Sequence, residues 1–312
     1  MISALLEVIL PVFLVLGFGY LAAYKKYFSE AGIDGLMQFS QNFAIPLLLF
    51  RAIATLDLSH GYDPKLFLSY YTGSFLSFAL GIVGARMWFA RQWDESVAIG
   101  FSALFANSLM LGLAIMERAY GAGALAPNYA IVSIHAPFCY FLGITTMEIV
   151  RNTRGGVLGT ASAVTRSMFR SNLMLAIALG FVVNLTGLHV PVAVMDALNL
   201  IIRAALPTAL FSLGAVLYRY RPEGDMGAVV MVCFISLFFH PAVAWLLSTQ
   251  VFHLSDGMVK GAVLTASMAP GVNSYMFANM YGVARRVAAT SVLVGTLFSV
   301  LSVSFWLTVL GV

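Results

Sequence analysis

The feature that most constrains this chain is a series of apolar stretches, each about as long as a bilayer is thick. The hydrocarbon core of a membrane requires about 20 consecutive apolar residues per helix. Ten stretches of this kind, separated by charged residues, glycine or proline, lie at residues 4–24, 36–55, 66–89, 96–117, 128–149, 171–188, 193–218, 226–248, 258–282 and 287–310. The sequence therefore predicts an all-α integral membrane protein with ten transmembrane helices.

The composition agrees and excludes several classes of protein. Of the 312 residues, 61% are hydrophobic and only 10% are charged, against roughly 25% charged in a soluble domain. Motifs for metalloproteases, serine hydrolases and ATP-binding loops are missing, as is an acidic pair within a span, so we expect neither an enzyme nor an ATP-driven pump. Cys139 and Cys233 both lie in apolar runs, so neither a metal nor another cofactor is expected.

The basic residues indicate the orientation in the membrane. Lys and Arg collect in loops that face the cytoplasm. Twelve of them fall on one side of the ten predicted spans and three on the other, which predicts cytoplasmic loops at 25–35, 86–96, 150–170 and 219–225. Both termini then lie on the non-cytoplasmic side of the plasma (inner) membrane. Because these charges belong to short loops, no nucleic-acid partner is expected.

The chain also divides into two similar halves. Residues 44–50, AIPLLLF, resemble residues 205–211, ALPTALF, and the prolines Pro46 and Pro207 are 161 positions apart. Tyr120-Gly121 and Tyr281-Gly282 are separated by the same 161 positions. We predict a five-helix repeat at 1–150, a short cytoplasmic linker at 151–170 and a second, inverted five-helix repeat at 171–312. Inverted repeats of this kind are typical of secondary transporters.

Two apolar stretches in corresponding positions are interrupted by polar residues and helix breakers, which is the best sequence indication of a transporter binding site. The predicted breaks lie near 107–112 and 269–273. The free N–H groups and the positive dipole end of a half-helix attract a carboxylate. The alternative is that the amides only bridge neighbouring helices, worth about 0.6 kcal/mol each. The candidate substrate-binding residues are Asn107, Ser108, Gly112, Pro270, Gly271, Asn273 and Ser274.

Arg51 and His135 are candidates for an accessory or coupling role. A buried arginine near the end of a span costs about 3 kcal/mol unless it is paired or hydrated, and the alternative is that Arg51 extends to the membrane surface. His135 and His240 each lie beside a proline. A titratable ring there suits proton coupling, and the alternative is a structural histidine. Coupling to protons or to sodium stays open.

Four segments resemble the auxin efflux carrier family, the PIN-like transporters, and within it bacterial malonate or dicarboxylate carriers. They are NFAIPLLLF at 42–50, ANSLMLGL with ERAYG at 106–121, LPTALFSLG at 206–214 and MAPGVNSY at 268–275. The resemblance implies two inverted five-helix repeats, with the fourth and ninth spans crossing as broken helices. It places the substrate at six of the residues above: Asn107, Ser108, Gly112, Pro270, Asn273 and Ser274. Many relatives carry proline where this chain has Ala114, so the first break is expected to be weaker or made by glycine alone.

The expected function is that of a permease that moves a small organic anion, a mono- or dicarboxylate such as malonate, by alternating access. One alternative is a sodium-coupled symporter similar to the bile-acid carriers. Another is a membrane sensor that keeps the fold without transporting. The partners expected are a small carboxylate and the lipid bilayer, and the sequence leaves open whether the chain works as a monomer or a homodimer.

Overall fold

The computed structural model describes residues 5–56, 62–151 and 172–311. The predicted linker at 151–170 lies almost entirely outside the described residues, so its role stays a prediction. Within the described residues the chain is helical, and its only strand-like feature is one isolated bridge between Ala106 and Pro270. The prediction of an all-α protein is confirmed for this part of the chain.

The first half of the chain contains helices that match the first five apolar stretches. They are η1 (Leu5–Ile9), α2 (Leu10–Tyr24), α3 (Glu30–Phe39), η2 (Ser40–Ala44), α4 (Ile45–Ala54), α6 (Pro64–Trp88), α7 (Trp93–Leu104), η3 (Ser108–Gly112), α8 (Leu113–Tyr120), η4 (Ala122–Leu125) and α9 (Ala126–Arg151).

The second half contains helices that match the other five. They are α11 (Asn172–Thr186), α12 (Val192–Leu217), α13 (Met226–Phe234), η5 (Ile235–Phe239), α14 (His240–Leu246), η6 (Leu247–Val251), α15 (Asp256–Ala266), α16 (Val272–Tyr281) and α17 (Arg285–Val309).

Six helical segments of the described chain are long and apolar enough to cross a membrane: Glu7–Tyr24, Pro64–Trp88, Ala122–Arg151, Val192–Leu217, Met226–Val251 and Arg285–Val309. Each coincides with one of the ten predicted stretches. The other four stretches form α3 to α4, the interrupted pairs α7 with α8 and α15 with α16, and α11, which is apolar but shorter.

Polar residues in the short loops start several of these helices. The Ser29 hydroxyl accepts a hydrogen bond from the Gly32 N–H, and the Asp63 carboxylate accepts one from the Lys65 N–H, directly before Pro64 at the first turn of α6. Asp225 caps α13 in the same way, through the N–H groups of Gly227 and Ala228. Such caps satisfy backbone donors that have no partner inside the helix.

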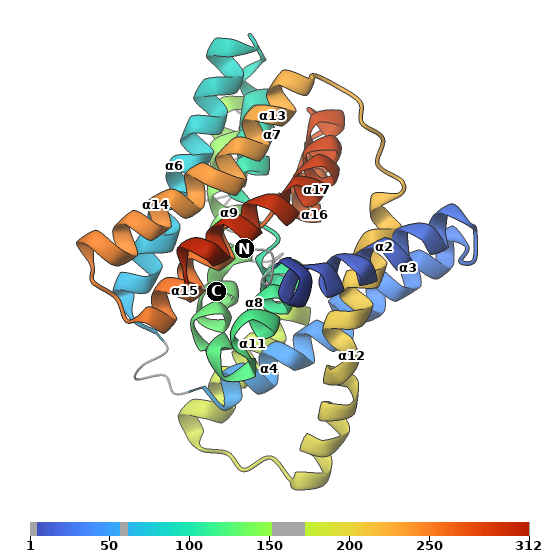
Figure 1. Cartoon of the computed structure of the whole chain (residues 1–312), viewed down its shortest axis with the longest axis vertical. Coiled ribbons are helices and arrows are strands. Elements are labelled where there is room, and N and C mark those ends of the chain that lie inside the picture. The colour runs from blue at the N-terminus through green and yellow to red at the C-terminus, as the bar shows by residue number, and fades with distance from the viewer. Residues whose placement is uncertain (1–4, 57–61, 152–171, 312) are drawn as a thin grey trace.

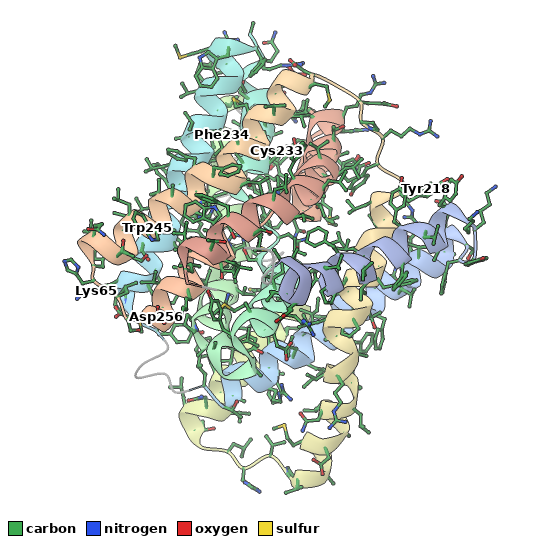
Figure 2. All side chains as sticks on the ribbon, in the orientation of Figure 1. Lys65, Tyr218, Cys233, Phe234, Trp245 and Asp256 are labelled. Carbon is green, nitrogen blue, oxygen red and sulfur yellow. The ribbon has the colours of Figure 1, made fainter. Side chains whose placement is uncertain are left out.

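Many large apolar side chains point outward. Phe234 on α13 is 60% exposed and Leu301 on α17 is 65% exposed. Figure 2 shows Phe234 on the outer face of α13. Extended apolar surface of this kind is rare on soluble monomers, and it is the surface that lipid chains cover.

The helices pack in two groups (Figure 1). Helices α2, α3, α4, α11 and α12 contact one another, whereas α6, α7, α9 and α13 to α17 form the second group. Helices α2 and α12 approach very closely: a Cβ atom at Gly19 would lie 1.9 Å from the Phe211 carbonyl oxygen. Helices α11 and α4 also meet at a glycine, where a Cβ atom at Gly180 would lie 2.9 Å from the Phe50 carbonyl oxygen.

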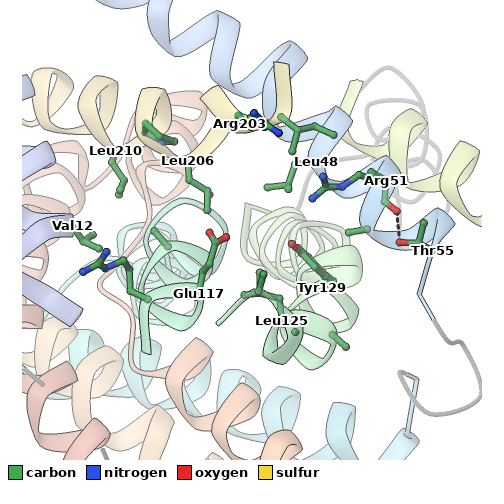
Figure 3. Close-up of a pocket in the computed structure, with 18 of the residues that line it drawn as sticks. Val12, Leu48, Arg51, Thr55, Glu117, Leu125, Tyr129, Arg203, Leu206 and Leu210 are labelled. Atoms are coloured by element: carbon green, nitrogen blue, oxygen red, sulfur yellow. Dashed lines mark hydrogen bonds between the residues drawn. The ribbon is translucent and has the colours of Figure 1, made fainter. Parts of the chain in front are cut away.

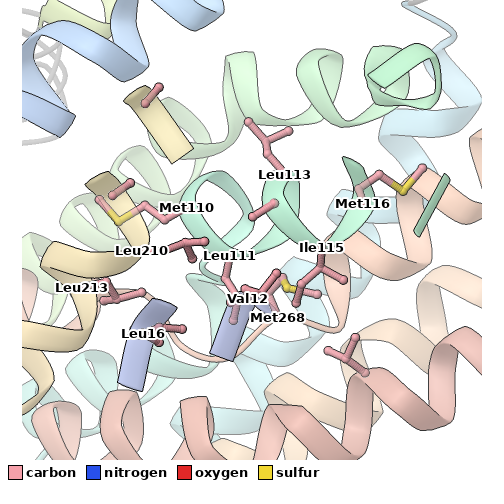
Figure 4. Packing of buried hydrophobic residues seen from close by; sticks show 14 of the residues in the cluster. Val12, Leu16, Met110, Leu111, Leu113, Ile115, Met116, Leu210, Leu213 and Met268 are labelled. Carbon is pink, nitrogen blue, oxygen red and sulfur yellow. The ribbon is translucent and has the colours of Figure 1, made fainter. Parts of the chain in front are cut away.

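A buried apolar cluster holds η3 and α8 against the first group (Figure 4). Leu111 and Leu113 are fully buried. They belong to one cluster with Leu16 of α2 and with Leu210 and Leu213 of α12. The position of the segment that follows the break after α7 is therefore set by apolar packing against α2 and α12.

Candidate functional site

Two helices are interrupted at the centre of the second group. Helix α7 ends at Leu104, and helical structure resumes at Ser108. Helix α15 ends at Ala266, and α16 begins at Val272. The two interruptions pair with each other as an antiparallel bridge, because the Asn107 N–H donates to the Ala269 carbonyl at 2.8 Å and the Gly271 N–H donates to the Phe105 carbonyl, also at 2.8 Å.

The position of the first break corrects one expectation. Gly112 lies inside the π-helical turn Ser108–Gly112, which continues directly into α8. The chain leaves the helix instead at Phe105 and Asn107, with ψ angles of 88° and 52°. No glycine is needed there, because both conformations are open to ordinary residues and the second interruption supplies the backbone hydrogen bonds that the helix gives up.

A cavity of about 240 Å³ lies beside this bridge, and we call it the crossover cavity. Four of the predicted substrate-binding residues line it: Asn107, Ser108, Gly271 and Asn273. Its other walls come from η2 and α9, whose polar or titratable residues at the cavity are Gln41, Asn42, His135 and Tyr140. The structure thus gathers residues from both halves of the chain around one small space.

The amides of Asn107 and Asn273 differ in their partners. The Asn107 side chain is only 6% exposed, and its Nδ2 atom has no hydrogen-bond partner among the described residues. Leaving a buried donor unpaired costs about 1 to 3 kcal/mol. The Asn273 Oδ1 atom accepts a hydrogen bond from the Tyr140 hydroxyl at 3.2 Å, which leaves the NH₂ end of that amide for a ligand. Both residues therefore place an amide in the cavity lining, and the Asn107 Nδ2 atom itself is covered by neighbouring atoms.

The other predicted residues have more structural surroundings. The Ser108 hydroxyl lies 3.1 Å from the Tyr70 hydroxyl. Gly112 faces Met268, and Pro270 packs against Gly295 of α17. Ser274 is fully buried, and its hydroxyl has no partner among the described residues. Gly112, Pro270 and Ser274 are not among the residues that line the cavity.

His135 and Arg51 lie in different places. His135 is buried at the crossover cavity, with its ring centroid 4.9 Å from that of Phe105. Arg51 lines a second cavity and donates from its NH1 atom to the Asn199 side-chain oxygen at 2.7 Å. The structure does not bring Arg51 to the two amides.

This second cavity, which we call the arginine cavity, has a volume of about 760 Å³. Its charged lining residues are Arg51, Glu117, Arg118 and Arg203, from α4, α8 and α12 (Figure 3). Tyr129 of α9 adds a hydroxyl. Of these four charged residues, sequence reasoning singled out only Arg51.

Among the polar and aromatic residues that line the crossover cavity, sequence reasoning missed four: Gln41, Asn42, Phe105 and Tyr140. A signal existed for Asn42, because it opens the NFAIPLLLF segment that carries the family resemblance. Tyr140 lies five positions after His135, a spacing at which helical residues do not share a face, so this spacing gave no signal for Tyr140. For Gln41 and Phe105 the sequence offers no comparable signal.

Outside the spans, an ion pair joins two loops. The Arg91 guanidinium donates to the Asp225 carboxylate at 2.9 Å. This hydrogen bond is the main cause of a lowered Asp225 pKa, with smaller contributions from the N–H groups that the carboxylate caps. The loop before α7 and the loop before α13 are therefore linked by charge.

Comparison with known proteins covers nearly the whole chain. The profile of a family described as membrane transport protein matches residues 4–307. The uncharacterized transporter YfdV of Escherichia coli is 22% identical over 303 residues, which cover 96% of this chain and 95% of that protein.

Two further relatives have more specific names. A protein of Rhizobium meliloti named "Putative malonate transporter" is 23% identical over 95% of this chain and 92% of its own length. Auxin efflux carrier component 8 of Arabidopsis thaliana is 22% identical over 93% of this chain and 92% of its own length. These matches confirm the family resemblance of the four sequence segments, and the chain belongs to the membrane transport protein family.

Proposed function

We propose that this membrane transporter carries a small organic anion, a mono- or dicarboxylate such as malonate, by alternating access. The observation that carries the proposal is the unpaired Asn107 amide, held at the crossover cavity by two interrupted helices. A buried donor without a partner is unusual in a folded protein. A ligand oxygen at the cavity would satisfy it.

The first turn of α16 adds donors that suit an anion. Its N-cap is Gly271, and no side chain caps the helix. Val272 and Asn273 line the cavity in that first turn, where N–H groups have no intrahelical partner. The positive end of the helix dipole favours a carboxylate there. The volume of about 240 Å³ suits a ligand smaller than a drug-sized molecule.

Alternating access is supported by the relation between the two cavities. Along α4 the crossover cavity is lined by Ile45 and the arginine cavity by Leu48. Three residues of helix span about 4.5 Å. On α9 the order is repeated, with Val132 at the crossover cavity and Tyr129 at the arginine cavity. The two spaces therefore lie at successive levels of the same helices, about one turn apart.

The layer between the two cavities is apolar. Ile45, Leu48 and Leu113 are almost completely buried and belong to one cluster. A carboxylate crossing this layer would lose its hydration without gaining polar partners. The layer therefore separates the two cavities until the helix groups move relative to each other.

The ten-helix inverted-repeat architecture is part of the proposal, and reciprocal contacts support it. Gly19 contacts the Phe211 backbone, and Gly180 contacts the Phe50 backbone. Gly180 follows Gly19 by 161 positions, and Phe211 follows Phe50 by 161 positions. In an inverted repeat, a contact from the first copy to the second copy recurs with the two copies exchanged, as these two glycine contacts do. The same 161-residue separation relates Pro46 to Pro207.

We also propose a membrane location and an orientation for the protein. The Lys and Arg distribution supports an orientation with both termini on the non-cytoplasmic side of the plasma membrane. Under this orientation the arginine cavity opens outward and the crossover cavity toward the cytoplasm.

Uptake into proteoliposomes tests the function. Purified protein should accumulate labelled malonate or another small carboxylate with saturable kinetics, and Asn273→Ala should weaken the apparent affinity. Parallel runs with a proton gradient, a sodium gradient or neither identify the coupling ion, and uptake that requires sodium would favour the symporter alternative. Folded protein that binds carboxylates without accumulating them would favour the sensor alternative and refute transport.

A further inference from the structure

We infer that the arginine cavity is a second anion-binding site, separate from the crossover cavity, and that it takes a dicarboxylate. Arg51 and Arg203 are the residues that bind the two carboxylate groups. Binding in this cavity can be measured by itself. Its role as a station on the transport path rests on the proposed function.

The arginine cavity carries an excess of unneutralised positive charge. Three guanidinium groups and one carboxylate line the cavity in the described part of the chain. No carboxylate of the described residues forms an ion pair with Arg51, Arg118 or Arg203. Arg51 is bonded to an amide oxygen of Asn199, and Arg118 to the backbone carbonyl of Glu7. These neutral acceptors orient the guanidinium groups without cancelling their charge.

Arg51 and Arg203 lie close to each other. Asn199, the partner of Arg51, lies four positions before Arg203 on α12. Residues at this spacing share one face of a helix. The hydrogen bond therefore brings the Arg51 guanidinium to the face that carries Arg203. Two like charges on one face repel each other unless an anion lies between them.

The direction of the side chains agrees with this placement. In Figure 3, Arg203 and Arg51 lie along one side of the cavity, and Glu117 and Tyr129 face them from the other. The Tyr129 hydroxyl is a further donor at the wall. Asp196 lies on α12 at a different surface hollow that also includes Arg203. It forms no ion pair with Arg203 within the described structure.

The charge balance selects the ligand class. Guanidinium groups bind carboxylates through paired hydrogen bonds, so two of them match two carboxylates. A monocarboxylate would engage one arginine and leave the other uncompensated. A tricarboxylate would bring its third charge toward Glu117. A dicarboxylate is the anion that satisfies both arginines without this repulsion.

The cavity size is consistent with a site that captures a hydrated ligand. At about 760 Å³ the arginine cavity is about three times as large as the crossover cavity of about 240 Å³. A dicarboxylate would keep part of its water shell there. It would lose that shell only on passing the apolar layer to the smaller cavity.

Equilibrium dialysis of the full chain in detergent, with labelled malonate as the probe, tests the inference. We expect one equivalent of bound malonate that is kept in Asn107→Ala and lost in the double variant Arg51→Gln with Arg203→Gln. Arg203→Gln alone should weaken this equivalent about tenfold or more. Arg203 is exposed and forms no ion pair among the described residues, so this single variant is expected to fold.

Two controls separate the site from general charge effects. Arg286→Gln removes a 77% exposed guanidinium at the start of α17 and should leave malonate binding unchanged. Arg51→Lys keeps the charge and should retain more binding than Arg51→Gln. Replacing malonate by propionate, a monocarboxylate, should abolish the arginine-dependent equivalent.

The inference is overturned if the arginine variants bind malonate as the unaltered protein does, or if the protein binds no dicarboxylate. Neither result refutes the proposed transport function, which stands if proteoliposomes accumulate a monocarboxylate. Conversely, an arginine-dependent malonate site without uptake of any carboxylate supports the second site and refutes transport.

Discussion

Asn107 and Asn128 are two buried asparagines with opposite hydrogen-bonding situations. The Asn107 Nδ2 atom has no partner among the described residues. The Asn128 Nδ2 atom donates to the Thr265 hydroxyl at 2.5 Å, and both of these side chains are fully buried. Replacing each by alanine therefore separates a ligand-binding amide from a structural one.

For Asn107→Ala we expect a large loss of affinity with little loss of stability. A hydrogen bond to a charged ligand is worth about 1.5 to 3 kcal/mol, which corresponds to about 10- to 150-fold in affinity. The ligand-free protein loses no hydrogen bond, because the Asn107 side-chain donor is unpaired there. Its melting temperature should stay close to that of the unaltered protein.

For Asn128→Ala we expect the reverse. The substitution leaves the buried Thr265 hydroxyl without its partner, at a cost of about 1 to 3 kcal/mol of folding free energy. Affinity should change little, since Asn128 does not line either cavity. The assays are thermal unfolding followed by tryptophan fluorescence and calorimetric titration with malonate. Both asparagine variants are titrated in the Arg51→Gln, Arg203→Gln background, so that only malonate binding at the crossover cavity is measured. If Asn107→Ala lowers the melting temperature as much as Asn128→Ala and keeps full affinity, the reasoning about Asn107 is refuted.

Three further predictions concern packing, pH and topology. Gly19→Ala should prevent recovery of monodisperse protein, because its Cβ atom would meet α12 at 1.9 Å, whereas Gly17→Ala, with no atom within 4 Å, should be tolerated; equal yields would contradict this. The hydrogen bond from Arg91 lowers the Asp225 pKa. The unaltered protein should therefore be more stable than Asp225→Asn above the ordinary aspartate pKa, and this difference should disappear as the pH falls through the lowered Asp225 pKa. Melting curves of both proteins at pH 3 to 7 check this. A cysteine introduced at Gly123, in the short helix η4 on the proposed outer side with no atom within 4 Å of its Cβ position, should react with an impermeant maleimide added outside intact cells. The two native cysteines are buried and should not react. Protection of the introduced cysteine would reverse the proposed orientation.

Much of the fold could be predicted because apolar periodicity and length report directly on membrane helices. Helical segments of the described chain occupy all ten stretches, and six of them meet the length and hydropathy of a span. The ends of the helices were less predictable. The sequence placed the start of the second stretch at 36, but the helix begins at Glu30, because the Ser29 cap extends it into a polar region.

The candidate site could be predicted in part, for a physical reason. Glycine, proline and amides interrupting an apolar run identify a broken helix from local sequence alone. The exact break at Phe105 to Asn107 depends on pairing with Ala269 and Gly271, which are far away in sequence. No local pattern reports that pairing, and so the sequence could place the first break only within 107–112, with a weaker break or one made by glycine alone as the alternatives.

Membership of the two cavities is also a non-local property. Arg51 and Asn199 are 148 positions apart and meet only because α4 packs on α12. Tyr140 reaches Asn273 across 133 positions. The sequence indicated which residue types could bind anions. It did not indicate which of them line the crossover cavity and which line the arginine cavity, because α4 and α9 line both cavities.

The bridge between the two interruptions is made of main-chain atoms only, from Asn107 to Ala269 and from Gly271 to Phe105. Backbone hydrogen bonds of this kind do not depend on which side chains the residues carry, except that proline would remove a donor. The frame that holds the crossover cavity can therefore persist while the side chains around it are exchanged. A change of cargo during evolution would then need only substitutions at the cavity wall, and laboratory selection for a new carboxylate should find its mutations there and leave the bridge backbone in place.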